Sequence, residues 1–346
     1  MSAPPAPQPR RRPWLHLFIV GAVGVALAGA AIAFSGWWFF VGRYRLPSIE
    51  ADEWSPGAPL GTYRIELPSD GRDRYYLLHT PPRSAEPLPP LLVALHGGGS
   101  RPEVMPALTG LLAVADREGF VVVLPAGIDG GWNDGRADSG QAAGRQGIDD
   151  IGFIRAVVED ASKHALVDMA RVFATGISNG AMMSSRLACE ASDVFAGIAP
   201  VAGTAAEGFE SWCRPARPVA VMAFLGTADP LVPFEGGDVG GIFLGRGRGR
   251  VVSASDFEAF WSQHNRCERQ PRDQLPDADR SDGSRASVEA FVGCTGGGEM
   301  AVYVLDGGGH TWPGGRQYLS PRLVGHTNRD LSASELMLQF FKGLRR

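Results

Sequence analysis

Short apolar runs alternate with segments of helical periodicity through most of this sequence. Five mainly apolar runs predict buried strands, at residues 91–95, 120–124, 171–174, 219–225 and 301–305. The periodic segments predict helices at 102–118, 149–166, 179–189, 255–264 and 334–344. Strands of this kind that alternate with helices indicate an α/β fold, with a mostly parallel sheet flanked by helices on both faces.

Several other segments are less regular. Two strand-like runs, at 63–67 and 75–79, precede the alternation. The helix at 255–264 is predicted to begin with a capping box formed by Ser255 and Glu258. The Gly/Arg-rich residues 236–250 and the charged residues 268–288 predict surface loops.

The longest apolar stretch comes near the start of the chain. From Trp14 to Val41 the only ionisable side chain is His16. A helix of this length spans about 42 Å, which is enough to cross a hydrocarbon core about 30 Å thick. Arginines at 10–12 precede the stretch and aromatic residues end it. These features predict a membrane anchor with its N-terminus in the cytoplasm.

Two other interpretations of this stretch stay open. Residues 31–33 (Ala-Ile-Ala) resemble the cleavage site of a signal peptide, and a twin-arginine export signal is a further alternative. All three interpretations place residues 46–346 outside the cytoplasm, either membrane-anchored or secreted.

Composition excludes several classes of function. Lys and Arg number 33 against 37 Asp and Glu, a net charge of −4, so no basic excess points to nucleic acid. The two lysines, Lys163 and Lys342, lie outside any GxxxxGK[ST] motif, which excludes a P-loop. No HExxH or CxxC motif occurs, and no metal or cofactor is predicted.

Four cysteines allow three disulfide connectivities: Cys189, Cys213, Cys267 and Cys294. Their order along the chain favours the pairs 189–213 and 267–294. Four unpaired cysteines are the alternative, but an oxidising compartment favours bridges.

A candidate nucleophile lies in Gly176-Ile177-Ser178-Asn179-Gly180, which matches G-x-S-x-G. The motif follows the predicted strand 171–174 and opens the helix 179–189, as a nucleophile elbow requires. The sequence therefore predicts Ser178 as a nucleophile, and an ordinary glycine-rich turn is the alternative.

A serine nucleophile needs a base, and in this strand–elbow–helix order an acid and then a histidine follow it. His310 follows strand 301–305 in a glycine-rich loop, and we predict it as the base. His264 falls within a predicted helix, and His326 lies in a loop without a defined strand before it.

The predicted acid is Asp229, which follows strand 219–225 in the segment Gly226-Thr227-Ala228-Asp229-Pro230. A carboxylate there can accept a hydrogen bond from the base and fix its tautomer. Asp238 and Asp256 are alternatives, although no predicted strand precedes either of them.

Upstream, strand 91–95 ends in His96-Gly97-Gly98-Gly99, which matches an HGGG-type loop. We predict that the backbone N–H groups of Gly98 and Asn179 form an oxyanion hole. The pattern does not decide between the three glycines. His96 precedes the serine and is interpreted as a residue that orients the loop.

Several motifs together resemble the polyhydroxybutyrate depolymerase and feruloyl esterase-like family of secreted α/β-hydrolases. They are LHGGGS (95–100), LPAGIDGGWNDGR (124–136), DDIGFI (149–154), GISNGAMMS (176–184), APVAG (199–203), GTADPLVPFEGG (226–237) and GGGHTWPGG (307–315). The resemblance implies a serine esterase that uses Ser178, Asp229 and His310. It also implies that Trp132 and Trp312 border the substrate pocket.

The expected domain organisation is a cytoplasmic stub with an anchor or signal segment (1–45), a linker (46–60) and an α/β-hydrolase domain (61–346). The expected substrates are polyhydroxybutyrate oligomers, feruloyl or aryl esters, or short-chain esters, and no protein partner is inferred. The alternatives are a catalytically inactive, membrane-tethered binding module, a serine peptidase and an acyltransferase.

Overall fold

A computed structural model describes residues 41–55, 60–82, 88–240 and 247–345. The chain divides into two compact units, Met1–Arg45 and Leu46–Arg346. Of the first unit only 41–45 are described, with one turn of 3-10 helix, η1 (Gly42–Tyr44). The predicted anchor at 14–41 therefore lies almost wholly outside the described residues and stays a prediction. Within the described ranges, no helix has the length and apolar character needed to cross a membrane.

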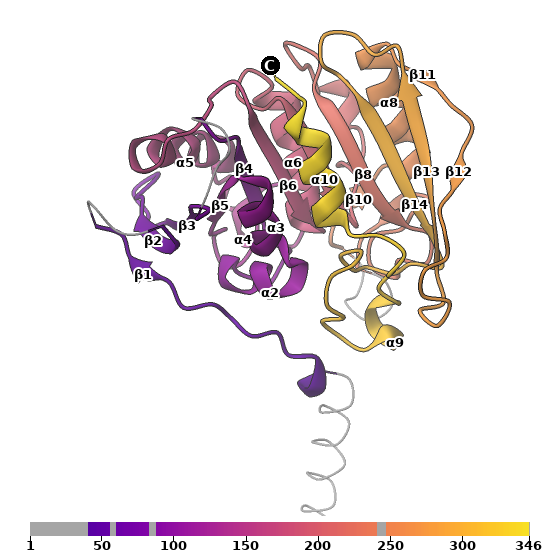
Figure 1. Cartoon of the computed structure of the whole chain (residues 1–346), viewed down its shortest axis with the longest axis horizontal. Coiled ribbons are helices and arrows are strands. Elements are labelled where there is room, and N and C mark those ends of the chain that lie inside the picture. The colour runs from indigo at the N-terminus through magenta and orange to yellow at the C-terminus, as the bar shows by residue number, and fades with distance from the viewer. Residues whose placement is uncertain (1–40, 56–59, 83–87, 241–246, 346) are drawn as a thin grey trace, which may run out of the picture. The chain divides into compact units, whose positions relative to one another are not determined.

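The second unit is built on a sheet of twelve described strands, most of which run side by side in Figure 1. Their order in space is β1 (Asp52–Glu53), β2 (Thr62–Glu66), β3 (Tyr75–His79), β5 (Val121–Pro125), β4 (Leu91–Leu95), β6 (Val172–Ile177), β7 (Gly197–Val201), β8 (Ala220–Gly226), β14 (Met300–Asp306), β13 (Arg285–Val292) and β11 (Glu268–Arg269). β12 (Asp273–Gln274) pairs with β13 off this path. The strands from β5 to β14 pair in parallel, so the predicted mostly parallel sheet is confirmed.

The strand order reverses at β4, which pairs with β5 on one side and with β6 on the other. Ligand sites in open α/β sheets lie at the carboxyl ends of the strands beside such a reversal. Leu95 at the end of β4 is in register with Gly176 in β6. The HGGG loop and the G-x-S-x-G turn therefore leave the same edge of the sheet as neighbours.

Helices cover both faces of the sheet. α5 (Asp150–His164), α6 (Asn179–Glu190) and α8 (Ala254–Asn265) bury side chains in the hydrophobic cluster on one face. α2 (Met105–Thr109), α3 (Leu111–Glu118) and α10 (Ala333–Lys342) do so on the other face, where Figure 1 shows α3 beside α10. Four short elements complete the helices of the described part of this unit: η2 (Pro102–Val104), α4 (Ala142–Arg145), η3 (Phe209–Ser211) and α9 (Pro321–Val324).

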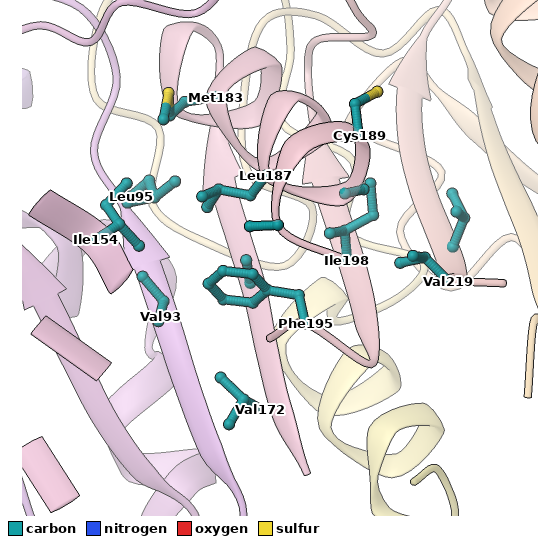
Figure 2. Packing of buried hydrophobic residues seen from close by; sticks show 14 of the residues in the cluster. Val93, Leu95, Ile154, Val172, Met183, Leu187, Cys189, Phe195, Ile198 and Val219 are labelled. Atoms are coloured by element: carbon teal, nitrogen blue, oxygen red, sulfur yellow. The ribbon is translucent and has the colours of Figure 1, made fainter. Parts of the chain in front are cut away.

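Alternate side chains of the central strands point to opposite faces of the sheet and enter the two hydrophobic clusters. Figure 2 shows Val93 and Leu95 of β4 on the side of the sheet where Leu187 of α6 lies. Leu92 and Ala94 between them belong to the opposite cluster. Each fully buried side chain of this size contributes about 1.5–3 kcal/mol of transfer free energy, so β4 is held from both sides.

The structure corrects five predicted segments. The helix predicted at 102–118 is broken into η2, α2 and α3, because Gly110 adopts a left-handed φ of 66° between the last two. α8 begins one residue before the predicted start, and its cap is the hydroxyl of Ser253, which accepts the N–H of Asp256. The predicted loop 268–288 holds β11, β12 and the start of β13, and the predicted loop 236–250 holds β9 (Gly237–Asp238) and the start of β10 (Arg250–Val251). β1 lies within the predicted linker 46–60 and pairs with β2.

Both predicted disulfides are present, Cys189–Cys213 and Cys267–Cys294. The first joins the end of α6 to the segment before β8. The second joins Cys267, just after α8, to Cys294, just after β13. Each bridge closes a loop between neighbouring elements, which typically stabilises a fold by about 2–4 kcal/mol.

Candidate active site

Ser178 lies in the tight turn between β6 and α6 with φ 59° and ψ −121°. A positive φ at a residue with a side chain costs on the order of 1–3 kcal/mol, and such residues cluster at functional sites. The neighbouring glycines make the turn possible. A Cβ on Gly176 would lie 2.5 Å from the backbone of Gly180, and one on Gly180 would lie 2.4 Å from the carbonyl of Leu95.

Ser178 is half-buried and lines a cavity of about 290 Å³. Its side chain forms no hydrogen bond with a described residue, so the hydroxyl is available to a ligand. The cavity wall includes Gly97, Gly98, Asn179 and His310. The structure therefore places four predicted site residues, Ser178, Asn179, Gly98 and His310, around one space.

Asp229 and His310 meet at the same edge, because β8 and β14 before them are parallel neighbours. The Nδ1–H of His310 donates to Asp229 Oδ2 at 2.7 Å. The other carboxylate oxygen accepts the backbone N–H groups of Leu231 and Val232, both at 2.8 Å. Since Nδ1 carries the proton, Nε2 is left as the hydrogen-bond acceptor of this imidazole.

Further contacts fix the backbone of His310. Its N–H donates to the carbonyl of Val324 at 2.6 Å, and its own carbonyl accepts the Tyr318 hydroxyl at 3.0 Å. Burial, with the Asp229 charge as a smaller cause, raises the pKa of Tyr318, so the hydroxyl stays a donor at neutral pH. Sequence reasoning missed Tyr318, because it follows no strand and belongs to no motif.

The structure excludes one of the three glycines of the HGGG loop as an oxyanion donor. The N–H of Gly99 donates to the carbonyl of Gly130 at 2.7 Å and is therefore occupied. Gly98 and Asn179 line the cavity, and their N–H groups have no acceptor in the described ranges. Gly97 also lines the cavity and its N–H has no described acceptor, so either Gly97 or Gly98 can serve with Asn179 as a backbone donor.

His96 fixes the HGGG loop through hydrogen bonds of both ring nitrogens. It is fully buried, its Nδ1–H donates to the carbonyl of Gly97, and its Nε2 accepts the N–H of Gly127, both at 2.9 Å. Burial lowers the pKa of His96 to about 4, so the ring is neutral at pH 7. The position agrees with the predicted role in orienting the loop.

The two predicted substrate-binding tryptophans lie elsewhere. Trp132 and Trp312 are both fully buried, and neither lines the cavity. Trp132 donates through Nε1 to the carbonyl of His96 at 2.9 Å, and Trp312 donates to the Ser334 hydroxyl at 3.0 Å. The structure therefore corrects this expectation: both indoles are packing residues that hold loops around the site.

A polar network fixes the side chain of Asn179. Its Oδ1 accepts the backbone N–H of Trp132 at 2.8 Å, and its Nδ2 donates to Asp134 Oδ2 at 2.6 Å. Asp134 also accepts from Nη2 of Arg136 at 2.7 Å, and both of these side chains are almost fully buried. The WNDGR segment thus positions the residue that follows Ser178.

The alternative acids and bases lie outside the cavity wall. His326 is exposed, and its contacts are through its carbonyl, which accepts from Gly309 and Thr311. Asp238 pairs with Arg250 at 3.3 Å, and Asp256 bonds to Ser253 at the start of α8. Among the residues with assigned positions, no group of three or more His, Cys, Asp or Glu side chains could hold a metal ion.

Comparison with known proteins agrees with this geometry. A family model described as "Esterase PHB depolymerase" matches residues 74–223. A protein of Nocardia uniformis subsp. tsuyamanensis named "Putative esterase NocK" is 36% identical over 297 residues, which are 83% of this chain and 85% of that protein. Feruloyl esterase B of Piromyces equi is 30% identical over 164 residues, 47% of this chain and 29% of that protein.

A solved structure of acetyl xylan esterase from Aspergillus awamori is similar with a TM-score of 0.51 and 12% identity, covering 72% of this chain and 94% of the other. That likeness shows the α/β-hydrolase fold. The match to NocK extends over most of both chains, and the relatives found are esterases by name. The chain belongs to the PHB depolymerase family of esterases and is a serine carboxylic ester hydrolase.

Proposed function

We propose that the chain hydrolyses its ester through an acyl-enzyme on Ser178, with His310 as the base and Asp229 as the acid that orients it. The observation that carries this proposal is the cavity itself. Ser178, in its positive-φ turn, and His310, bonded to Asp229 at 2.7 Å, both line it.

In the first step Ser178 Oγ forms a bond to the ester carbonyl carbon, while its proton moves to His310 Nε2. The carbonyl oxygen becomes an oxyanion that accepts from the N–H groups of Gly98 and Asn179. Collapse of this intermediate breaks the bond to the alcohol oxygen, which takes the proton from Nε2. Asp229 stabilises the imidazolium between these two transfers.

In the second step water attacks the acyl carbon and gives a proton to Nε2. The bond to Oγ then breaks, and Oγ recovers the proton. Removal of one oxyanion donor typically lowers turnover about 10²- to 10³-fold. By holding the side chain of Asn179, the polar network around it also positions the backbone N–H of the same residue.

The substrate classes that we infer are short-chain esters, feruloyl or aryl esters, and hydroxybutyrate oligomers. A cavity of about 290 Å³ suits a small acyl or alcohol group. The family match and the relative named feruloyl esterase B support the same range.

We further propose that residues 46–346 work outside the cytoplasm, held by the apolar stretch at 14–41 or released after its cleavage. The two disulfides support this location, because such bridges persist in oxidising compartments.

A fluorophosphonate probe tests the mechanism, because it reacts covalently with an activated serine. Peptide mapping should find the label on Ser178, and S178A should remain unlabelled. H310A should react at least about 10⁴-fold more slowly, since single losses within a triad cost about that much or more in turnover. H326A is the matched control, because the imidazole of His326 is exposed and outside the cavity. Normal ester hydrolysis by S178A would overturn the mechanism.

A further inference from the structure

We propose that the Arg248 guanidinium binds a free carboxylate on the substrate, so that the enzyme prefers monoanionic esters to matched neutral ones. The inference rests on the proposed function, because it assigns a substrate class to the same cavity. Arg248 is half-buried and lines that cavity together with Ser178 and His310. Its guanidinium makes no ion pair or hydrogen bond with a residue whose position is described.

The other charged groups around the cavity are matched. Arg136 also lines the wall, but its guanidinium donates to the carboxylate of Asp134. Asp229 is bonded to His310 and does not itself reach the wall. Aspartate and glutamate are absent from the cavity lining formed by the described residues. Arg248 therefore adds a positive charge that has no counter-ion among the described residues.

The backbone of Arg248 is tied to the reaction centre. Its carbonyl accepts Nη1 of Arg136 at 2.6 Å, and Arg136 holds Asp134, which holds Asn179. The aliphatic part of the Arg248 side chain packs on Gly140, where a Cβ would lie 3.6 Å from Cγ. These contacts hold the backbone and the Cγ of Arg248 at the cavity wall, and they link its carbonyl through Arg136 and Asp134 to Asn179.

The rest of the wall is mainly apolar, including Val104, Leu108, Ile177, Leu231, Val232 and Val239. A mainly apolar wall with one guanidinium that has no acceptor among the described residues suits a ligand with an aliphatic body and one carboxylate. Two classes of ester have this form: hydroxy-acid oligomers with a free carboxyl end, and monoesters of dicarboxylic acids.

Two substrate pairs test the proposal, each differing only by a carboxylate in place of a carboxamide. 3-(Butanoyloxy)butanoate and its amide carry the group on the alcohol side. Monoethyl adipate and ethyl adipamate carry it on the acyl side. Wild type should favour the carboxylate in at least one pair, with a kcat/KM ratio of about 10 to 100, as expected for hydrogen bonds to charged groups.

R248Q should bring that ratio close to one, and R248K should retain part of it because the charge remains. R250Q is the matched control. Arg250 lies two residues away, outside the cavity wall, and pairs with Glu207 and Asp238 on the surface. Its loss should leave the ratio unchanged. A ratio near one in wild type for both pairs, or a preference that survives in R248Q, would overturn the proposal.

A binding measurement distinguishes failure of the carboxylate site from failure of the proposed catalytic mechanism. If wild type hydrolyses none of the four esters, the proposed function fails for these substrates, and calorimetry with S178A still measures affinity for 3-(butanoyloxy)butanoate. Adding R248Q should then weaken binding about tenfold or more. Equal affinity with and without R248Q would overturn the carboxylate site.

Discussion

His96 shows how one buried side chain sets the shape of the loop after β4. In its neutral form it donates to Gly97 and accepts from Gly127, so both ring nitrogens are used. Protonation of Nε2 would place its N–H against the N–H of Gly127, so this hydrogen bond would be lost. Burial and geometry therefore favour the same neutral form.

We expect the protein to lose stability in acid because of this residue. The pKa of His96 is about 4 in the folded chain, whereas an unfolded histidine has a pKa of about 6.5. Between these values the unfolded chain binds a proton that the folded chain does not. The free energy of unfolding should therefore fall as pH drops from about 6.5 to about 4, by up to about 3 kcal/mol.

Urea denaturation across this pH range measures the effect, and H96Q, which cannot titrate there, should show a shallower fall. An NMR titration of wild type gives an independent reading that does not depend on how H96Q folds. An imidazole of His96 that titrates near pH 6.5 in the folded protein would contradict the prediction.

At the same scale, sequence patterns brought together the proposed reacting residues, but not the residues that surround them. Ser178, Asp229 and His310 each follow a strand, so their order along the chain was enough to bring them together in the prediction. A tryptophan in a loop has the same sequence signal whether it packs or faces a ligand, and Trp132 was therefore misassigned. Arg136, Arg248 and Tyr318 act through tertiary contacts that no local spacing encodes.

Among the elements, the break between α2 and α3 depends on one residue. Gly110 has φ 66° and ψ 10°, and a Cβ there would meet nothing within 4 Å. The strain of G110A would thus come from the backbone alone. We expect it to destabilise the fold by about 1 kcal/mol, as a side chain forced into the left-handed region does.

Gly343 provides the control. A Cβ there also meets nothing within 4 Å, but its φ of −87° suits any residue. G343A should leave stability unchanged or raise it by up to about 1 kcal/mol, because alanine lowers the entropy of the unfolded chain. Thermal unfolding of G110A and G343A measures the difference. Equal unfolding midpoints in the two variants would contradict the prediction that backbone strain at Gly110 destabilises G110A.

Sequence reasoning found the strands that are continuous apolar runs, such as β4 and β5. It missed β7, which is buried at every position but contains Gly197 and Pro200. β13 was missed because it alternates buried and more exposed positions and carries Glu289, whose buried carboxylate is bonded to Arg269 and Arg272. A charged pattern of this kind is typical of loops, and only tertiary ion pairs make it a strand.

For the whole molecule, the location of the enzyme is the main prediction. Fractionated cells should hold full-length chain in the membrane fraction, with residues 46–346 digested only by protease added from the outside. A soluble mature form that begins near residue 34 would indicate a cleaved signal segment instead. Full-length chain in the cytosolic fraction would contradict both interpretations and the proposed export.

The pairing of Asp229 with His310 has a consequence for biosynthesis. The two residues are 81 positions apart, and at about 5–20 residues per second the ribosome needs roughly 4 to 16 seconds to add that stretch. During this interval the growing chain already contains its serine and its acid but no base. The proposed triad is incomplete until β14 pairs with β8, so we expect a chain that ends before β14 to lack esterase activity.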